Sequence, residues 1–323
     1  MVDGTIALVF PGQGCQSVGM GADVIAASPE ARELYERADE ILGFELSTLC
    51  FEGPTEELND TANTQPAIYV TTMALWEALS PRLERLRPRI AFAAGHSLGE
   101  FSALAAAGAV GFGDGLRLVR RRGEAMRDAG VTAPGGMAAI IGLTDDVVEE
   151  IVAQVNGEEG VGGPGVWMAN FNSPGQVVIS GESGALDRAI ALARERKAKR
   201  ALRLSVSVAC HTPLMEGASQ RLAVALEETP FKSPWVPVVS NAEAVPLSDP
   251  ERIKAALLRQ LSSPVRWVES IDHMVANGVT TTLEIGPKAV VSGLIRRIHR
   301  PTKLHSITDS DSIKAFDEEA LLG

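Results

Sequence analysis

Cysteine is scarce in this chain of 323 residues, which contains only Cys15, Cys50 and Cys210. An odd, widely spaced set without a C-x-x-C pair forms neither a disulfide framework nor a cysteine metal site. His299 and His305 alone do not make a metal site either. The sequence therefore predicts reduced thiols and no bound metal.

Long hydrophobic runs and an excess of positive charge are also missing. The longest uncharged stretch near the middle, residues 101–113, is shorter than the roughly 20 apolar residues of a membrane-spanning helix, and the N-terminus lacks the basic cluster of a secretory signal. The 30 basic and 41 acidic side chains give a net charge of −11, which opposes general attraction to nucleic acid or anionic lipid. We expect a cytoplasmic protein that binds neither nucleic acid nor membranes. Without an apolar stripe at heptad spacing, we also expect a monomer.

What the chain does contain is an alternation of strand and helix patterns towards both ends. Residues 6–10, 89–95, 236–240 and 280–285 have patterns typical of strands. Helical patterns cover residues 28–42, 65–79, 213–228, 250–261, 267–277 and 290–299. Ser28 and Pro29 form a helix-start pattern. This alternation predicts a mostly parallel sheet covered on both faces.

Between these two regions the order changes to strand, helix, strand, strand, helix, strand. The strands are expected at residues 137–143, 166–171, 176–180 and 202–208, and the helices at 145–155 and 183–197. That order is typical of a ferredoxin-like unit. The sequence therefore predicts a small subdomain, residues 136–204, inserted into a large one formed by residues 1–135 and 205–323. The chain enters the insertion at Gly135-Gly136 and leaves it near Ser207.

The sharpest motif is Gly95-His96-Ser97-Leu98-Gly99, at the end of an expected strand and the start of an alanine-rich helix. A serine on such a turn has its hydroxyl exposed above the sheet at a helix N-terminus. The alternative is a purely structural turn. The strand before the motif and the helix after it favour Ser97 as a nucleophile.

A serine hydroxyl needs a base to remove its proton. His96 adjoins Ser97, where neighbouring side chains diverge, so we expect it at the pocket rim. His211 follows an apolar segment and precedes Thr212-Pro213, a helix-start pattern. This places it at a strand end, where open α/β sheets carry their active sites. We favour His211 as the base over a buried structural histidine. The other histidines lie among charged residues and are expected at the surface: His273, His299 and His305.

No carboxylate stands out as the group that orients the His211 ring. Glu284 and Asp272 are candidates, and a main-chain carbonyl can hold the same ring nitrogen, so a triad and a dyad are both open.

The oxyanion of a tetrahedral intermediate needs two N–H donors. The amide of Leu98, just past the serine, is one, and Gln13 in the loop Pro11-Gly12-Gln13-Gly14 can offer the second. The same loop does not match a dinucleotide fingerprint, because Ser17 stands where a third glycine is needed.

A helix expected from Asp114 onwards carries Arg117, Arg120, Arg121 and Arg122. At about 100° per residue, Arg122 falls at the edge of the apolar face while the other three point away. A buried guanidinium needs an anionic partner. Either an internal carboxylate or the carboxylate of a substrate meets this need.

Seven segments occur in a fixed order between about Thr5 and Arg297. They are Phe10-Pro11-Gly12-Gln13-Gly14, Thr64-Gln65-Pro66-Ala67, Gly95-His96-Ser97-Leu98-Gly99-Glu100, Arg122-Gly123, Asn170-Phe171-Asn172-Ser173-Pro174-Gly175-Gln176, His211 and Glu284-Ile285-Gly286-Pro287. In order and spacing they resemble the motifs of the acyltransferase family of fatty-acid and polyketide synthesis, the malonyl-CoA:acyl carrier protein transacylases. The resemblance implies an α/β-hydrolase-like large subdomain with an inserted ferredoxin-like subdomain.

The resemblance also implies a role for each matching residue. Ser97 would carry the malonyl ester, His211 would be base and then acid, and Arg122 would bind the free malonyl carboxylate. Gln13 and Leu98 would form the oxyanion hole, and the main-chain carbonyl of Gln260 would orient His211. The residues that would line the pocket are Gln65, His96 and Asn172.

The implied substrates are malonyl-CoA and the phosphopantetheine thiol of an acyl carrier protein, with coenzyme A present only as part of the substrate and no cofactor. An acidic carrier would dock on a basic cluster, either residues 194–200 or the group at residues 296–303.

Two alternatives stay open within this resemblance. The segment Val208-Ala209-Cys210-His211 departs from the common versions of a signature that tracks the extender unit. A polyketide synthase acyltransferase for a substituted malonyl unit is therefore one alternative, and an acyl-thioester hydrolase on the same fold is another. A non-catalytic carrier-binding protein is disfavoured, because nucleophile, base and oxyanion loop occur together.

Overall fold

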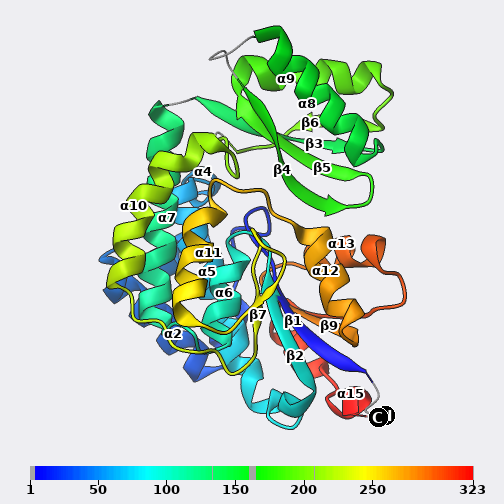
Figure 1. The fold of residues 1–323 in the computed structure, drawn as a ribbon. Helices are drawn as coiled ribbons and strands as arrows, with labels where there is room; N and C mark the ends of the chain where they lie inside the picture. Colours follow the sequence, from blue (N-terminus) through cyan, green and yellow to red (C-terminus); the bar gives the residue numbers. More distant parts are fainter. Residues whose placement is uncertain (1–3, 133, 160–164, 207, 323) are drawn as a thin grey trace.

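A computed structural model describes residues 4–132, 134–159, 165–206 and 208–322. The chain forms a large α/β subdomain and a smaller one above it, coloured green in Figure 1. This confirms the predicted fold class. The model has no helix, among the residues it describes, that is long and apolar enough to cross a membrane.

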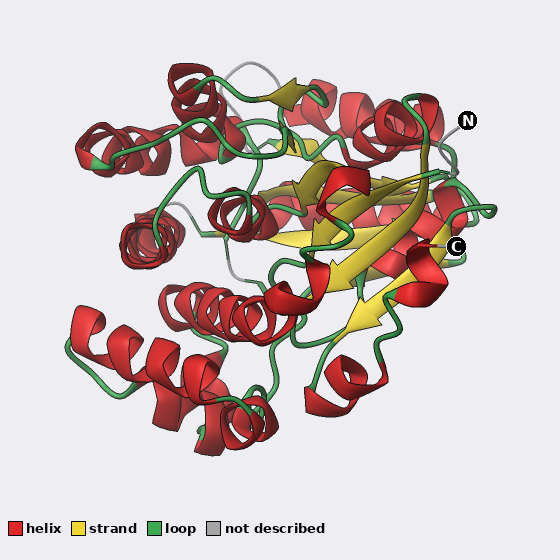
Figure 2. Cartoon of the chain, turned by 90° about the horizontal axis from the view of Figure 1, so that it is seen from below, coloured by secondary structure: helices red, strands yellow, loops and turns green. Residues whose placement is uncertain are grey.

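The large subdomain is built on a six-stranded sheet in the order β10-β9-β1-β2-β7-β8. All neighbouring strands are parallel except β7 and β8. Helices lie on both sides of this sheet (Figure 2). The strands are β1 (Thr5–Phe10), β2 (Ile90–Gly95), β7 (Val238–Val239), β8 (Pro246–Leu247), β9 (Val279–Ile285) and β10 (Lys303–Ile307).

Helices α2, α5, α11 and α14 of this subdomain each begin at a residue whose side chain caps them. Ser28 accepts the N–H of Ala31 at 3.2 Å and Pro29 follows it, which confirms the expected start of α2. The helices are α1 (Ala22–Ala27), α2 (Pro29–Leu42), α3 (Leu46–Glu52), α4 (Thr55–Leu58), α5 (Thr61–Leu83), α6 (Gly99–Ala106), α7 (Phe112–Thr132), α10 (Glu216–Glu228), α11 (Pro250–Gln260), α12 (Trp267–Ala276), α13 (Val291–Ile298), α14 (Ser310–Ala315) and α15 (Glu319–Leu322), with short 3₁₀ turns at Arg87–Arg89 and Pro213–Met215.

The small subdomain has a four-stranded antiparallel sheet in the order β4-β5-β3-β6. Its strands are β3 (Gly135–Ile141), β4 (Val166–Ser173), β5 (Gln176–Glu182) and β6 (Arg200–Arg203), and its helices are α8 (Asp145–Glu159) and α9 (Ser183–Glu195). The limits of 136 and 204 stay a prediction, and the exit near Ser207 falls on a residue outside the described ones.

The two faces of the small sheet bury different side chains. Ala138 and Ile140 of β3 pack in the core beneath α8 and α9, whereas the alternating residues Met137 and Ala139 pack with the core of the large subdomain. This is the alternation expected of a strand with both faces covered. The small sheet therefore presents one face to the large subdomain.

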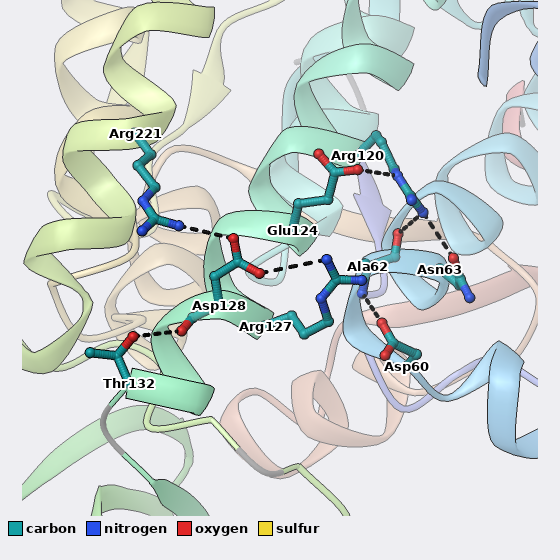
Figure 3. A network of polar contacts seen from close by, with 9 residues as sticks. All are labelled: Asp60, Ala62, Asn63, Arg120, Glu124, Arg127, Asp128, Thr132 and Arg221. Carbon is teal, nitrogen blue, oxygen red and sulfur yellow. Dashed lines mark hydrogen bonds and ion pairs between the residues drawn. The ribbon is translucent and has the colours of Figure 1, made fainter. Parts of the chain in front are cut away.

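Helix α5 begins earlier than the sequence predicted. Gln65-Pro66 was interpreted as a helix start, but Asp60 caps the helix by accepting the N–H of Ala62 at 2.8 Å. Pro66 then lies inside the helix, where it cannot donate to the carbonyl of Ala62. Arg120 of α7 donates to that carbonyl instead, at 3.0 Å (Figure 3). A tertiary contact thus allows the helix to pass through a proline.

Other boundaries also differ from the prediction. Strand β6 ends at Arg203 rather than at residue 208, and α7 begins at Phe112, two residues before Asp114. Strand β10 was not expected, because His305 and Lys303 break its apolar pattern. It pairs only with β9, at the edge of the sheet, where half-exposed polar side chains are tolerated.

Candidate active site

Ser97 lies on the turn between β2 and α6, as the motif predicted. Its φ is 52°, in the left-handed region that non-glycine residues rarely adopt. Two contacts hold its main chain: its N–H donates to Oδ1 of Asn241 at 2.6 Å, and its carbonyl accepts Nε2 of Gln260 at 3.0 Å. The strained turn is therefore fixed on both sides, with the hydroxyl directed away from the sheet.

His211 meets the Ser97 hydroxyl, with 2.8 Å between Nε2 and Oγ. Its Nδ1 faces the carbonyls of Gln260, at 2.9 Å, and Ser263, at 3.2 Å. Because carbonyl oxygens only accept, Nδ1 carries the proton and Nε2 is free to accept the proton of Ser97. Burial, together with the nearby Arg122 charge, lowers the pKa of His211 to about 3. The imidazole is thus neutral at physiological pH, the form that a general base requires.

Among the described residues, both groups that contact Nδ1 of His211 are main-chain carbonyls, and neither Glu284 nor Asp272 contacts it. Glu284 instead accepts the N–H groups of Val290, Val291 and Ser292 at 2.7–2.9 Å, at the start of α13.

The loop after β1 lies directly against the serine turn. A Cβ built on Gly12 would lie 2.3 Å from the carbonyl oxygen of His96, so only glycine permits this approach. Within the described residues, neither the N–H of Gln13 nor that of Leu98 has a hydrogen-bond acceptor. Two unused N–H groups flanking a serine are what an oxyanion hole requires.

Arg122 is the one buried arginine of the five on α7, at 1% exposure. Its Nη1 donates to Oε1 of Gln65 at 2.8 Å, and its Nη2 donates to Oγ of Ser97 and to Oε1 of Gln260, both at 3.0 Å. No carboxylate in the described part of the chain pairs with it, and its Nε has no partner. Burial lowers the pKa of Arg122 to about 10, so it remains charged at neutral pH. The internal salt bridge considered from the sequence is absent among these residues.

A cavity of about 200 Å³ lies between the two subdomains and includes Ser97 and His211 in its wall. His96 and Asn172 also line it, and they contact each other at 2.7 Å between Nε2 and Oδ1. Gln65, expected in the lining, lies behind Arg122 and holds its guanidinium.

Sequence reasoning missed the site roles of two residues. Asn241 donates Nδ2 to the carbonyl of Gly95 at 2.7 Å while it accepts from Ser97. Glu100, buried in the first turn of α6, accepts Nε2 of Gln260 at 2.7 Å and the N–H of Asn241 at 3.2 Å. The position of Asn241 just after an expected parallel strand could have indicated it.

Comparison with known proteins agrees with this arrangement. The family model for the acyl transferase domain matches residues 7–311. The malonyl CoA-acyl carrier protein transacylase of Bacillus subtilis is 43% identical over 96% of this chain and 95% of its own length.

Solved structures show the same likeness. An acyl-carrier-protein S-malonyltransferase from Bartonella henselae superposes with a TM-score of 0.92 at 41% identity, covering 99% of both chains. A malonyl-transacylase solved in complex with a type II PKS acyl-carrier protein has a TM-score of 0.91 at 40% identity, covering 98% of this chain and 99% of its own. The chain therefore belongs to the acyl transferase domain family, among the malonyl CoA-acyl carrier protein transacylases.

Proposed function

We propose that this protein transfers a malonyl group from malonyl-CoA to the phosphopantetheine thiol of an acyl carrier protein, through an ester on Ser97. One observation carries the proposal. The Ser97 hydroxyl contacts the neutral imidazole of His211 at 2.8 Å and the buried guanidinium of Arg122 at 3.0 Å. That guanidinium has no carboxylate partner among the described residues. The names of its relatives, at 43% identity for the Bacillus subtilis protein, support the same reaction.

The first half-reaction loads the serine. His211 Nε2 takes the proton of the Ser97 hydroxyl as its oxygen attacks the thioester carbonyl, and the N–H groups of Gln13 and Leu98 stabilise the oxyanion. The C–S bond then breaks, and coenzyme A leaves with the proton from His211. In the second half-reaction, the carrier thiol gives its proton to His211 and attacks the ester carbonyl. The C–O bond breaks, and Ser97 regains the proton.

Arg122 supplies the countercharge for the malonyl carboxylate. In the unliganded site its Nη2 donates to Ser97 Oγ and to Gln260 Oε1. A carboxylate accepts two parallel N–H bonds more strongly than these neutral oxygens do. Binding malonyl therefore moves Nη2 from the serine hydroxyl to the substrate and leaves the serine proton to His211.

The carrier protein is proposed to dock beside α13. Arg296, Arg297 and Arg300 are exposed, and no carboxylate in the described ranges pairs with them. The same helix lines the cavity with Val291 and Leu294.

In the other basic cluster, by contrast, the charges are partly used within the chain. Arg196 pairs with Glu150 at 3.0 Å and Arg194 donates to the carbonyl of Ala201 at 2.9 Å. An acidic carrier therefore meets more free positive charge at α13.

Mass spectrometry tests the reaction. Malonyl-CoA should add one malonyl group to the intact protein, on the Ser97 peptide, and Ser97→Ala should prevent it. Adding a carrier that bears phosphopantetheine should move the group to its thiol, while the same carrier without that arm should not accept it. Release of free malonate with no labelled carrier would identify a hydrolase instead.

Parallel reactions define the substrate and the carrier. Methylmalonyl-CoA beside malonyl-CoA tests the alternative of a substituted extender unit, to which Cys210 in the cavity wall is relevant. A fatty-acid carrier beside a type II polyketide carrier tests the pathway.

Docking has its own test. Arg296→Glu with Arg300→Glu should raise the KM for the carrier about tenfold and leave loading from malonyl-CoA unchanged. The matched control, Arg194→Glu with Arg196→Glu, should not change that KM. A larger effect of the control pair would place docking on the other cluster.

We further propose that the enzyme is a cytoplasmic monomer that needs no cofactor. Gel filtration and activity after exhaustive dialysis against a chelator test the last two points, and cell fractionation tests the first.

A further inference from the structure

Glu100 is a buried carboxylate behind the reacting centre. Its side chain is 3% exposed, and no lysine, arginine or histidine of the described residues forms an ion pair with it. Among the described residues its side chain accepts two hydrogen bonds, both at Oε2, from Nε2 of Gln260 at 2.7 Å and from the N–H of Asn241 at 3.2 Å. Its hydrogen-bond donors are all neutral, and burial raises the pKa of Glu100 to about 7 even with the Arg122 charge nearby. Burying such a carboxylate is unfavourable for stability. Stabilisation of the fold is thus a poor explanation for its presence.

The two donors to Glu100 are the residues that hold the main chain of Ser97. Asn241 accepts the Ser97 N–H at 2.6 Å, and Gln260 donates to the Ser97 carbonyl at 3.0 Å. The left-handed conformation of Ser97 persists only if its surroundings hold it. Glu100 accepts a hydrogen bond from each of the two residues that hold Ser97, Asn241 and Gln260.

Gln260 connects Glu100 to the other two reacting groups. Its main-chain carbonyl accepts Nδ1 of His211 at 2.9 Å, and its side-chain Oε1 accepts Nη2 of Arg122 at 3.0 Å. Its Nε2 is surrounded by two acceptors, the Glu100 carboxylate and the Ser97 carbonyl. If the amide rotated by half a turn, Oε1 would face these two acceptors and the NH₂ group would face the Arg122 guanidinium, so acceptor would meet acceptor and donor would meet donor. The Glu100 oxygen, together with the Ser97 carbonyl and Arg122, therefore selects one orientation of this amide.

We propose that Glu100 is a positioning residue, whose Oε2 fixes the Gln260 amide and Asn241 and thereby places Ser97, His211 and Arg122 around the acyl group. The proposal rests on the proposed acyl transfer for its physiological meaning. Its physical content, the placement of Ser97 against His211, is independent of which acyl group is carried.

Two substitutions separate the position of the oxygen from its charge. Glu100→Gln keeps the side-chain length and an oxygen acceptor but removes the charge. Glu100→Asp keeps the charge but shortens the side chain by one methylene, which moves the oxygen away from Gln260 and Asn241. The first readout is the rate at which an alkyl fluorophosphonate modifies Ser97, which reports the Ser97–His211 pair without any malonyl substrate. The second is the rate of loading from malonyl-CoA relative to acetyl-CoA, and the third is the KM for the carrier.

Glu100→Asp should slow both reactions of Ser97 about 100-fold, the effect of a displacement near 1 Å, and reduce the preference for malonyl over acetyl. Glu100→Gln should retain most of the rate and of the preference, and the carrier KM should be unchanged in both. Asp309→Ala, which removes the capping box of α14 at the far edge of the sheet, is the control: it should lower the unfolding temperature and leave all three readouts unchanged.

Several results would overturn the proposal. If Glu100→Gln is no faster than Glu100→Asp, the oxygen position does not matter. If both variants keep wild-type rates and only unfold at a lower temperature, Glu100 is structural. Should Glu100→Asp fail to fold, Gln260→Met takes its place, because it removes the same amide and keeps the main-chain acceptor of His211; it should show the same losses, and wild-type rates would reject the proposal. If the wild type formed no malonyl adduct but the variants still differed as expected in their rates with the fluorophosphonate, the proposed function would be rejected and the positioning role of Glu100 would stand.

Discussion

Arginine side chains on the two sides of helix α7 have different kinds of partner. Arg120 is half-buried on the outer side and donates to Glu124, Asn63 and the carbonyl of Ala62 (Figure 3). Farther along, Asp128 pairs with both Arg127 and Arg221. On the inner side, the hydrogen bonds of Arg122 to the described residues all go to neutral oxygens.

This difference identifies Arg122 as the buried arginine of α7 whose charge is available to a bound ligand. Arg117, Arg120 and Arg127 on the outer side are balanced by carboxylates of the chain and partly screened by water, so each pair contributes little to stability. The inner arginine is desolvated and forms no direct ion pair among the described residues, although the nearby Glu100 charge raises its pKa. A substrate carboxylate would complete its surroundings, and we expect the following substitutions to separate the two sides.

The largest effect is expected from Arg122→Ala. Loading of Ser97 from malonyl-CoA should fall about 100- to 1000-fold, the usual cost of removing one partner of a buried charge pair. The rate with acetyl-CoA should fall less, because acetyl has no carboxylate to bind. Parallel rates with the two thioesters measure this, and an unchanged malonyl-to-acetyl ratio would remove Arg122 from substrate recognition.

A smaller effect is expected from Arg122→Lys, which keeps the charge but removes the planar fork. Malonyl loading should fall about 10- to 100-fold, since an ammonium cannot bind a carboxylate through two parallel bonds and hold Gln65 as well. The loss should appear mainly in kcat/KM for malonyl-CoA. Full activity of this variant would show that charge alone is sufficient.

The dependence of stability on pH should also distinguish the two sides. The pKa of His211 is lowered to about 3, against 6.5 for an ordinary histidine. Below pH 6.5 the unfolded chain binds a proton that the folded protein does not, so the stability present above that pH is lost as the pH falls towards 3.

Between pH 6.5 and pH 5 this single group should contribute a loss of about 2 kcal/mol. In Arg122→Ala the loss should level off at a higher pH, because the Arg122 charge is one cause of the lowered pKa, whereas Arg120→Ala should not change the profile. Urea unfolding at a series of pH values from 6.5 down to 3 measures it. Identical pH profiles in both variants would mean that the Arg122 charge does not influence His211.

The smallest effect is expected from Arg120→Ala. It removes the donor to the Ala62 carbonyl that Pro66 leaves without an intrahelical partner, so unfolding should require about 1–2 kcal/mol less free energy. Arg121→Ala, at an exposed position of the same helix, is the control and should cost less than about 0.5 kcal/mol. Malonyl loading should be unchanged in both, and a large loss of activity in Arg120→Ala would break the distinction between the two sides.

Several features could be predicted from the sequence because they depend on neighbouring residues or on periodicity. The Ser97 turn follows from an apolar strand, two glycines and an alanine-rich helix in direct succession. The burial of Arg122 follows from its angle on α7 relative to the apolar face, and the insertion from the order of its strands and helices.

Other features required contacts between distant segments. The interior position of Pro66 depends on Arg120, 54 positions later in the sequence numbering, and the two carbonyls on His211 belong to residues about 50 positions away. A carbonyl acceptor leaves no trace in residue identity, because every residue has one. For this reason the sequence left a triad and a dyad equally open.

The sequence alone determined which chemical groups this protein has and where strands and helices would present them, because hydrophobic period and turn chemistry are local. Only the tertiary structure decided that Arg122 has no carboxylate partner among the described residues and that Glu100 lies behind Ser97. Countercharge and hydrogen-bond orientation depend on through-space distances of about 3 Å, and those distances are set by the packing of segments far apart in the chain.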